Sequence, residues 1–147
     1  MQMIEQNGFG GKTMKIYLDA CCLNHPFDDQ RQERIRLESE AILIILNRLH
    51  IGEWEWIGSE ALEIEIENTP NIERKNYLMK LLSHVHKSLK IQKKELRRAN
   101  QLKEIGFKPF DATHIACSES GRSDIFLTTD DKLLKLSRRM RTELNVM

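Results

Sequence analysis

Long hydrophobic runs are absent from this sequence of 147 residues. The longest apolar run, Ala41–Leu46, falls far short of the roughly 20 residues that a membrane-spanning helix needs. The N-terminus also lacks a basic segment followed by an apolar stretch, which a secretion signal requires. We therefore expect no membrane partner and a cytoplasmic location.

Cysteine is scarce, and several catalytic motifs are missing. Cys21, Cys22 and Cys117 have none of the spacings of a zinc site, and we expect them to be buried thiols in a reducing compartment. The sequence contains no P-loop, no Gly-x-Ser-x-Gly elbow and no His-Glu-x-x-His motif. These absences exclude P-loop nucleotide hydrolysis, the α/β-hydrolase serine mechanism and the commonest zinc peptidases.

An excess of positive charge is also missing. The chain has 23 basic and 22 acidic residues, so the whole molecule has no field that draws it onto nucleic acid. Any binding of nucleic acid therefore depends on local clusters of basic residues. The alternative is that such clusters are ordinary solvent-exposed faces without a partner. Two clusters of this kind are Lys93, Lys94, Arg97 and Arg98, and Arg138, Arg139 and Arg141.

The order of apolar patterns predicts an α/β fold. Residues 1–13 are polar and rich in glycine, so we expect a disordered leader followed by one folded domain at 14–147. Strand patterns at 15–18, 54–57, 89–91 and 125–128 alternate with helical patterns at 35–49, 60–67, 72–86, 93–105, 109–117 and 130–140. A turn at 24–29 and a last edge strand at 144–146 complete the pattern. Such alternation favours a mostly parallel sheet covered on both faces.

Acidic residues occur at the ends of two predicted strands. Asp19 ends the first strand and Asp130 follows the strand at 125–128, so both are expected at the same edge of the sheet, where α/β proteins bind ligands. Glu65 lies on a predicted helix, and Asp111 lies in the first turn of another. The alternative role for Asp111 is to interact with the helix dipole as a first-turn charge.

A cluster of carboxylates repels itself unless a cation lies within it. Hard oxygen ligands suit Mg²⁺ or Mn²⁺, which retain waters and bind substrate phosphates. Such an ion lowers the pKa of a bound water and neutralises charge on a phosphodiester. The carboxylates therefore indicate metal-assisted hydrolysis of a phosphate ester.

The motifs around these carboxylates resemble those of the PIN-domain nucleases, in particular the VapC-like toxin ribonucleases. Residues 16–20 (IYLDA) are similar to the family's first strand with its first metal-binding Asp, and 26–29 (PFDD) to the turn of one branch. In the segment 57–66, Glu65 follows Ser59 by six positions and matches the second acidic residue, although Glu63 is a rival. Residues 110–116 (FDATHIA) and 127–134 (LTTDDKLL) resemble the third and fourth motifs.

The resemblance implies a three-layer α/β/α Rossmann-like sandwich and cleavage of RNA that depends on Mg²⁺ or Mn²⁺. It makes Asp19, Glu65, Asp111 and Asp130 both the metal ligands and the catalytic residues. Many relatives are homodimers and pair with an antitoxin, so both partners are expected alongside RNA. One alternative is an inactive PIN-like module that binds RNA or protein. A phosphatase that uses Asp19 is disfavoured, because Cys21 stands where a second Asp would be needed.

Three other residues are expected to have secondary roles near this site, and a fourth departs from the family pattern. Thr128 is expected to orient a carboxylate or a water. Asp131 either contributes to the site or caps the next helix, with the cap favoured. His114 lies one helical turn after Asp111 and either approaches the site or packs beside it. The sequence departs from the family at Ala20, where many relatives have Thr or Ser directly after the first Asp.

Overall fold

The computed structural model describes residues 13–147, so all of the expected leader except Thr13 lies outside the described residues. Four strands form one sheet in the order β3-β2-β1-β4, and every neighbouring pair is parallel. The strands are β1 (Lys15–Leu18), β2 (Glu55–Ser59), β3 (Lys87–Leu89) and β4 (Ile125–Leu127). The central strand β1 has neighbours on both sides.

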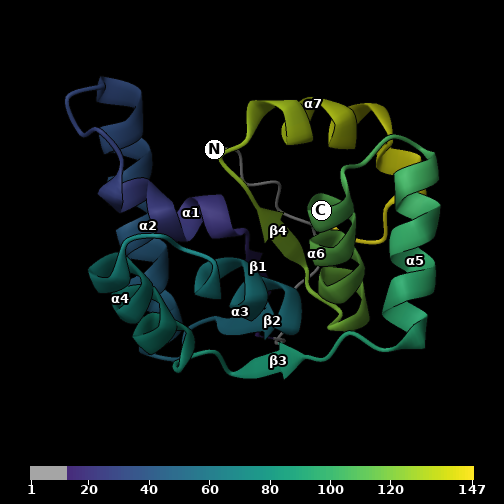
Figure 1. Ribbon diagram of the computed structural model, residues 1–147, viewed down its shortest axis with the longest axis horizontal. Coiled ribbons are helices and arrows are strands. Elements are labelled where there is room, and N and C mark those ends of the chain that lie inside the picture. The colour runs from purple at the N-terminus through teal and green to yellow at the C-terminus, as the bar shows by residue number, and fades with distance from the viewer. Residues whose placement is uncertain (1–12) are drawn as a thin grey trace.

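Helices cover both faces of the sheet (Figure 1). One layer contains α1 (Ala20–Asn24), α2 (Glu33–His50), α3 (Glu60–Glu67) and α4 (Ile72–Leu82), whose apolar residues share one core with β1. The opposite layer contains α5 (Lys93–Glu104), α6 (Pro109–Ser120) and α7 (Asp131–Arg139). Two short 3₁₀ turns, η1 (His25–Phe27) and η2 (Arg141–Glu143), complete the chain. The prediction of an α/β/α sandwich with a parallel sheet is confirmed.

Successive side chains of β1 point to opposite faces of the sheet, so this strand contributes to the core on each side. Ile16 and Leu18 point into the first layer, whereas Tyr17 lies on the other face with Ile57 and Cys117. All three of these β1 side chains are fully buried. A strand that is buried on both faces is typical of a parallel sheet between two helix layers.

Local signals fix where the helices near the carboxyl ends of the strands begin. Ser59 caps α3, because its Oγ accepts a hydrogen bond from the backbone N–H of Leu62. Pro109 opens α6, where its missing N–H costs nothing. These starts place the first turns of α3 and α6 at the edge of the sheet where Asp19 lies.

The structure differs from the prediction in several places, among them the third strand, which lies at Lys87–Leu89 instead of 89–91. No helix is predicted between Asp19 and the turn at 24–29, but this segment forms α1, because the side chain of Asp19 accepts a hydrogen bond from the backbone N–H of Ala20.

Helix α4 ends at Leu82 instead of His86. The backbone N–H of His86 donates to the carbonyl of Trp56 in β2, and the backbone N–H of Trp56 donates to Nδ1 of His86. Residues 144–146 form no strand in the described chain. Val146 packs into the core with α5, α6 and α7, and the backbone N–H of Phe126 in β4 donates to the carbonyl of Met147 at 2.6 Å.

Among residues 13–147, no helix combines the length and the apolar character needed to cross a membrane.

Candidate metal centre

Asp19 and Asp130 lie at the same edge of the sheet, as predicted. Leu18 of β1 is level with Leu127 of β4, and the two strands are parallel. The backbone N–H of Asp19 donates to the carbonyl of Leu127 at 2.9 Å. The carboxyl ends of β1 and β4 are therefore adjacent, and Asp19 lies beside the residues that follow Leu127.

The carboxylate of Asp19 is buried, with 6% of the residue exposed. Its Oδ1 accepts from the backbone N–H of Ala20 at 2.9 Å. Its Oδ2 accepts from the hydroxyl of Thr128 at 2.9 Å and from the thiol of Cys21 at 3.4 Å. Burial raises the pKa of Asp19, while His114 and these side-chain hydrogen bonds oppose the rise. The group is held in one orientation at an energetic cost that a cation would relieve.

The missing hydroxyl at position 20 has substitutes in the structure. Ala20 offers only its backbone N–H, but Thr128 reaches Asp19 from the neighbouring strand end. The thiol of Cys21 contacts both groups, since its sulfur lies 3.2 Å from the hydroxyl oxygen of Thr128. Asp19 is thus oriented from β4 as well as from the residues that follow it.

Glu65 and His114 join Asp19 from the two helix layers. Nε2 of His114 lies 2.8 Å from Oε2 of Glu65 and 4.0 Å from Oδ1 of Asp19. The three residues offer atoms that all lie within 4.8 Å of one another. Glu63, the rival of Glu65, turns elsewhere on α3 and accepts a hydrogen bond from Ser88.

Asp111 lies in the first turn of α6 and responds to the other carboxylates. Its pKa is raised to about 6, first by burial and then by the negative charges of Asp19 and Asp130. His114 and Lys108 oppose the rise. A carboxyl group that is destabilised by two like charges lies in a region of negative potential.

The order of roles at the start of α7 differs from the prediction. Asp130, not Asp131, caps the helix, because Oδ1 of Asp130 accepts from the backbone N–H groups of Lys132 and Leu133. Asp131 is the first helical residue, and its exposed carboxylate forms an ion pair with Arg34 of α2. The favoured role of Asp131 as a cap is therefore wrong.

The donor set fits a hard divalent cation. Asp19 and Glu65 bring carboxylate oxygens to within 4.8 Å of each other and of His114, while Asp111 and Asp130 lie outside this close group. The charges of Asp19 and Asp130 still raise the pKa of Asp111, so a cation near these residues would relieve their repulsion. Mg²⁺ and Mn²⁺ favour such oxygen ligands and tolerate a nitrogen neighbour. The close group of Asp19, Glu65 and His114 therefore offers atoms that could hold a metal ion.

Sequence reasoning missed the part played by Tyr17. Its hydroxyl lies 2.6 Å from Nδ1 of His114 and 2.6 Å from Oγ of Ser59, and all three side chains are buried. A signal was present, since a tyrosine within a buried strand needs a partner for its hydroxyl. The sequence does not say which partner the fold supplies.

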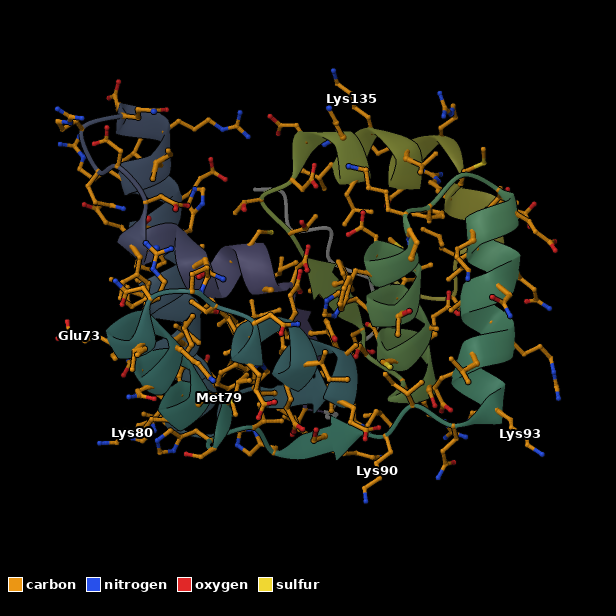
Figure 2. All side chains as sticks on the ribbon, in the orientation of Figure 1. Glu73, Met79, Lys80, Lys90, Lys93 and Lys135 are labelled. Atoms are coloured by element: carbon orange, nitrogen blue, oxygen red, sulfur yellow. The ribbon has the colours of Figure 1, made fainter. Side chains whose placement is uncertain are left out.

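The two basic clusters have different surroundings. On α5, Arg98 is engaged by the carboxylate of Glu119 at 2.7 Å, and the side chain of Lys93 extends away from the body of the molecule (Figure 2). Arg138 and Arg141 instead line a pocket of about 450 Å³ that also includes Thr128, the residue that contacts Asp19. The C-terminal cluster thus shares a pocket with Thr128, whose hydroxyl donates to Asp19, while none of the four predicted carboxylates lines that pocket.

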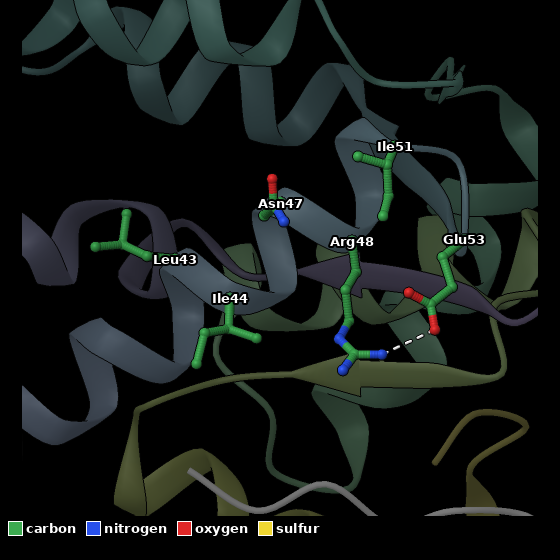
Figure 3. A pocket seen from close by; sticks show the side chains of 6 residues that line it. All are labelled: Leu43, Ile44, Asn47, Arg48, Ile51 and Glu53. Carbon is green, nitrogen blue, oxygen red and sulfur yellow. Dashed lines mark hydrogen bonds and ion pairs between the residues drawn. The ribbon is translucent and has the colours of Figure 1, made fainter.

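Another hollow, also of about 450 Å³, lies along the outer face of α2 (Figure 3). Leu43, Ile44 and Ile51 contribute apolar side chains to it. The acidic residue that lines it, Glu53, forms an ion pair with Arg48 at 2.8 Å. This hollow is not lined by a group of carboxylates and is not a candidate for the same chemistry.

Comparison with known proteins supports the fold of this chain but does not show its activity. No family model matches the sequence, and no curated protein matches it. Among solved structures, the chain is similar to the crystal structure of FitAcB from Neisseria gonorrhoeae, with a TM-score of 0.56 and 15% sequence identity. The match covers 84% of this chain and 93% of that one. The protein has a PIN-like α/β fold.

Proposed function

We propose that residues 14–147 form one nuclease domain that hydrolyses RNA phosphodiester bonds with a divalent cation, Mg²⁺ or Mn²⁺. Asp19, Glu65, Asp111 and Asp130 hold the ion in this account. The observation that carries the proposal is the convergence of buried Asp19 with Glu65 on a PIN-like fold. The pKa of Asp111, which burial and then the charges of Asp19 and Asp130 raise to about 6, supports it.

Each group of residues at the site has its own task in this reaction. The cation supplies charge neutralisation at the phosphate and a more acidic water. Asp19 fixes the position of the site, since three hydrogen bonds hold its carboxylate. Asp111 is half buried and its pKa is raised to about 6, which suits a carboxylate of the cluster that takes a proton from an attacking water. Arg138 and Arg141 contact the RNA backbone.

The proposal also includes the partners that the family resemblance implies. We propose that an antitoxin covers the carboxylates when the enzyme is not required, and that the chain forms a homodimer. Both rest on the resemblance of the motifs around Asp19, Asp111 and Asp130 to those of the PIN-domain nucleases. Size-exclusion chromatography with light scattering measures the homodimer directly.

The experiment uses purified protein and an end-labelled RNA of mixed sequence. We expect cleavage with Mn²⁺ or Mg²⁺, none with EDTA, and loss to the level of buffer in Asp19→Asn. Glu63→Gln is the matched control, because it removes a carboxylate from the same helix as Glu65 but outside the cluster. Cleavage that persists in EDTA or in Asp19→Asn would refute the proposal. RNA binding without heat from Mn²⁺ would support the inactive module instead.

A further inference from the structure

A continuous chain of hydrogen bonds runs from the backbone to the candidate metal centre. The backbone N–H of Leu62 donates to Oγ of Ser59 at 3.2 Å. Oγ of Ser59 lies 2.6 Å from the hydroxyl of Tyr17, which lies 2.6 Å from Nδ1 of His114. Nε2 of His114 then lies 2.8 Å from Oε2 of Glu65. Ser59, Tyr17 and His114 are each at most 1% exposed, so no bulk water competes for these bonds.

Donor counting fixes the direction of the chain at its two ends. A backbone N–H can only donate, so Ser59 accepts at the first bond and has its single hydroxyl proton left for Tyr17. An ionised Glu65 can only accept, so Nε2 of His114 carries the proton of the last bond. The neutral ring then has a lone pair at Nδ1, which accepts the proton of Tyr17.

The opposite direction leaves one hydroxyl poorly placed. If Nδ1 of His114 carried a proton, Tyr17 would have to donate toward Ser59. The hydroxyl of Ser59 would then be left with the sulfur of Cys117, a weak acceptor. Burial also raises the pKa of Tyr17, which keeps its phenol proton in place for donation.

We propose that His114 is a positioning residue for Glu65 and not a metal ligand, because Ser59 and Tyr17 hold its ring as the Nε2–H tautomer. Distance alone suggests a ligand, since Nε2 lies within 4.8 Å of the carboxylate oxygens of Asp19 and Glu65. A protonated Nε2, however, has no lone pair for a cation. It donates to Oε2 of Glu65, so the other carboxylate oxygen of Glu65 would be available to a bound cation. This inference rests on the proposed metal-dependent function.

Glu65 has a particular need for such support. Its side chain is 37% exposed, and it has three rotatable bonds that water alone would leave free. Asp19, in contrast, is fixed by three donors of its own. Groups that orient a metal ligand typically contribute about 10–100-fold to metal affinity, so removal of the His114 donor should weaken the site by that order.

The first test reads the tautomer in metal-free protein. Long-range ¹H–¹⁵N correlation spectra of the imidazole rings separate Nε2–H from Nδ1–H, and His114→Gln identifies the signals of His114. We expect the Nε2–H form in the wild type and mixed tautomers in Tyr17→Phe. An Nδ1–H or doubly protonated ring at neutral pH overturns the inference.

The second test measures Mn²⁺ affinity by calorimetry in two variants. His114→Gln keeps an N–H donor near the position of Nε2, so it should retain affinity close to that of the wild type. His114→Leu removes the donor and should bind about 10–100-fold more weakly. Equal loss in both variants, with ¹⁴N modulation in the electron spin echo of Mn²⁺-loaded wild type, makes His114 a ligand and overturns the inference.

The two tests also separate this inference from the proposed function. If the wild type binds no Mn²⁺, the metal-dependent function fails, while the tautomer of His114 still shows whether the hydrogen-bond chain has the inferred direction. If His114→Leu does not fold, the comparison of His114→Gln with the wild type still decides whether an N–H donor is sufficient.

Discussion

At the scale of single residues, the centre is defined by how differently its carboxylates are held. Asp19 is buried and bound by three donors, Glu65 is held by His114, and Asp130 serves as a helix cap. Asp111 has no comparable set of donors among the described residues, and its pKa is raised to about 6 by burial and by Asp19 and Asp130. Asp111 is therefore the residue at which function and stability conflict most.

Asp111→Asn should stabilise the metal-free protein at pH 7–8. The pKa of about 6 lies above the ordinary value of 3.8, so the ionised group opposes folding above the raised pKa. That opposition fades as the pH falls through about 6, and asparagine never has it. Thermal unfolding between pH 5 and pH 8 should thus show a gain in Tm that shrinks toward pH 5. A gain of the same size at both ends of this range would contradict an electrostatic origin.

At the scale of secondary structure, the start of α7 combines a structural and a chemical task in one side chain. Oδ1 of Asp130 accepts from two backbone N–H groups of α7, while its charge raises the pKa of Asp111. The ion pair between Asp131 and Arg34 joins α7 to α2 at the same place. Both partners of that pair are more than half exposed, so it contributes little to stability.

Two substitutions at Asp130 separate its tasks. Asparagine caps helices about as well as aspartate, so Asp130→Asn should leave the free energy of unfolding nearly unchanged but weaken Mn²⁺ binding. Asp130→Ala should lose both the helix cap and the metal ligand, and the lost cap should lower the free energy of unfolding by about 0.5–2 kcal/mol. Urea unfolding without metal and calorimetry with Mn²⁺ measure the two effects. Equal Mn²⁺ affinity in Asp130→Asn and wild type would remove Asp130 from the ligand set.

The sequence specified the elements better than their connections. Apolar periodicity and the acidic residues after two strands predicted the sheet and the meeting of Asp19 with the end of β4, because both are local patterns with fixed geometry. It did not predict α1, which the side chain of Asp19 caps, or the link from Tyr17 to His114. The link from Tyr17 requires contact between residues far apart in the chain, which no local pattern encodes.

At the scale of the whole molecule, the charge is balanced and the arrangement of charge decides what binds. The formal net charge is +1, so long-range attraction of RNA is weak. The carboxylates would repel a phosphate backbone unless a cation and nearby arginines offset them. Arg138 and Arg141 share a pocket with Thr128, whereas the cluster on α5 includes Arg98, which Glu119 engages.

The two basic clusters can be ranked by paired substitutions. Arg138→Gln with Arg141→Gln should lower kcat/KM for RNA more than Lys93→Gln with Lys94→Gln, because only the first pair lines the pocket that includes Thr128. It should also flatten the dependence of RNA binding on salt, since a protein with fewer phosphate contacts releases fewer counterions. Fluorescence anisotropy between roughly 50 and 200 mM salt measures this dependence. A larger effect of the lysine pair would place the RNA on α5.

The most direct test of the whole account is anomalous diffraction from crystals that contain Mn²⁺. We predict one or two strong peaks among the carboxylates, with oxygen atoms of Asp19 and Glu65 about 2–2.3 Å from a metal and Asp111 or Asp130 near it. Nε2 of His114 should not coordinate a metal. Crystals at saturating Mn²⁺ with no peak beside Asp19 would contradict a metal-dependent nuclease on this fold.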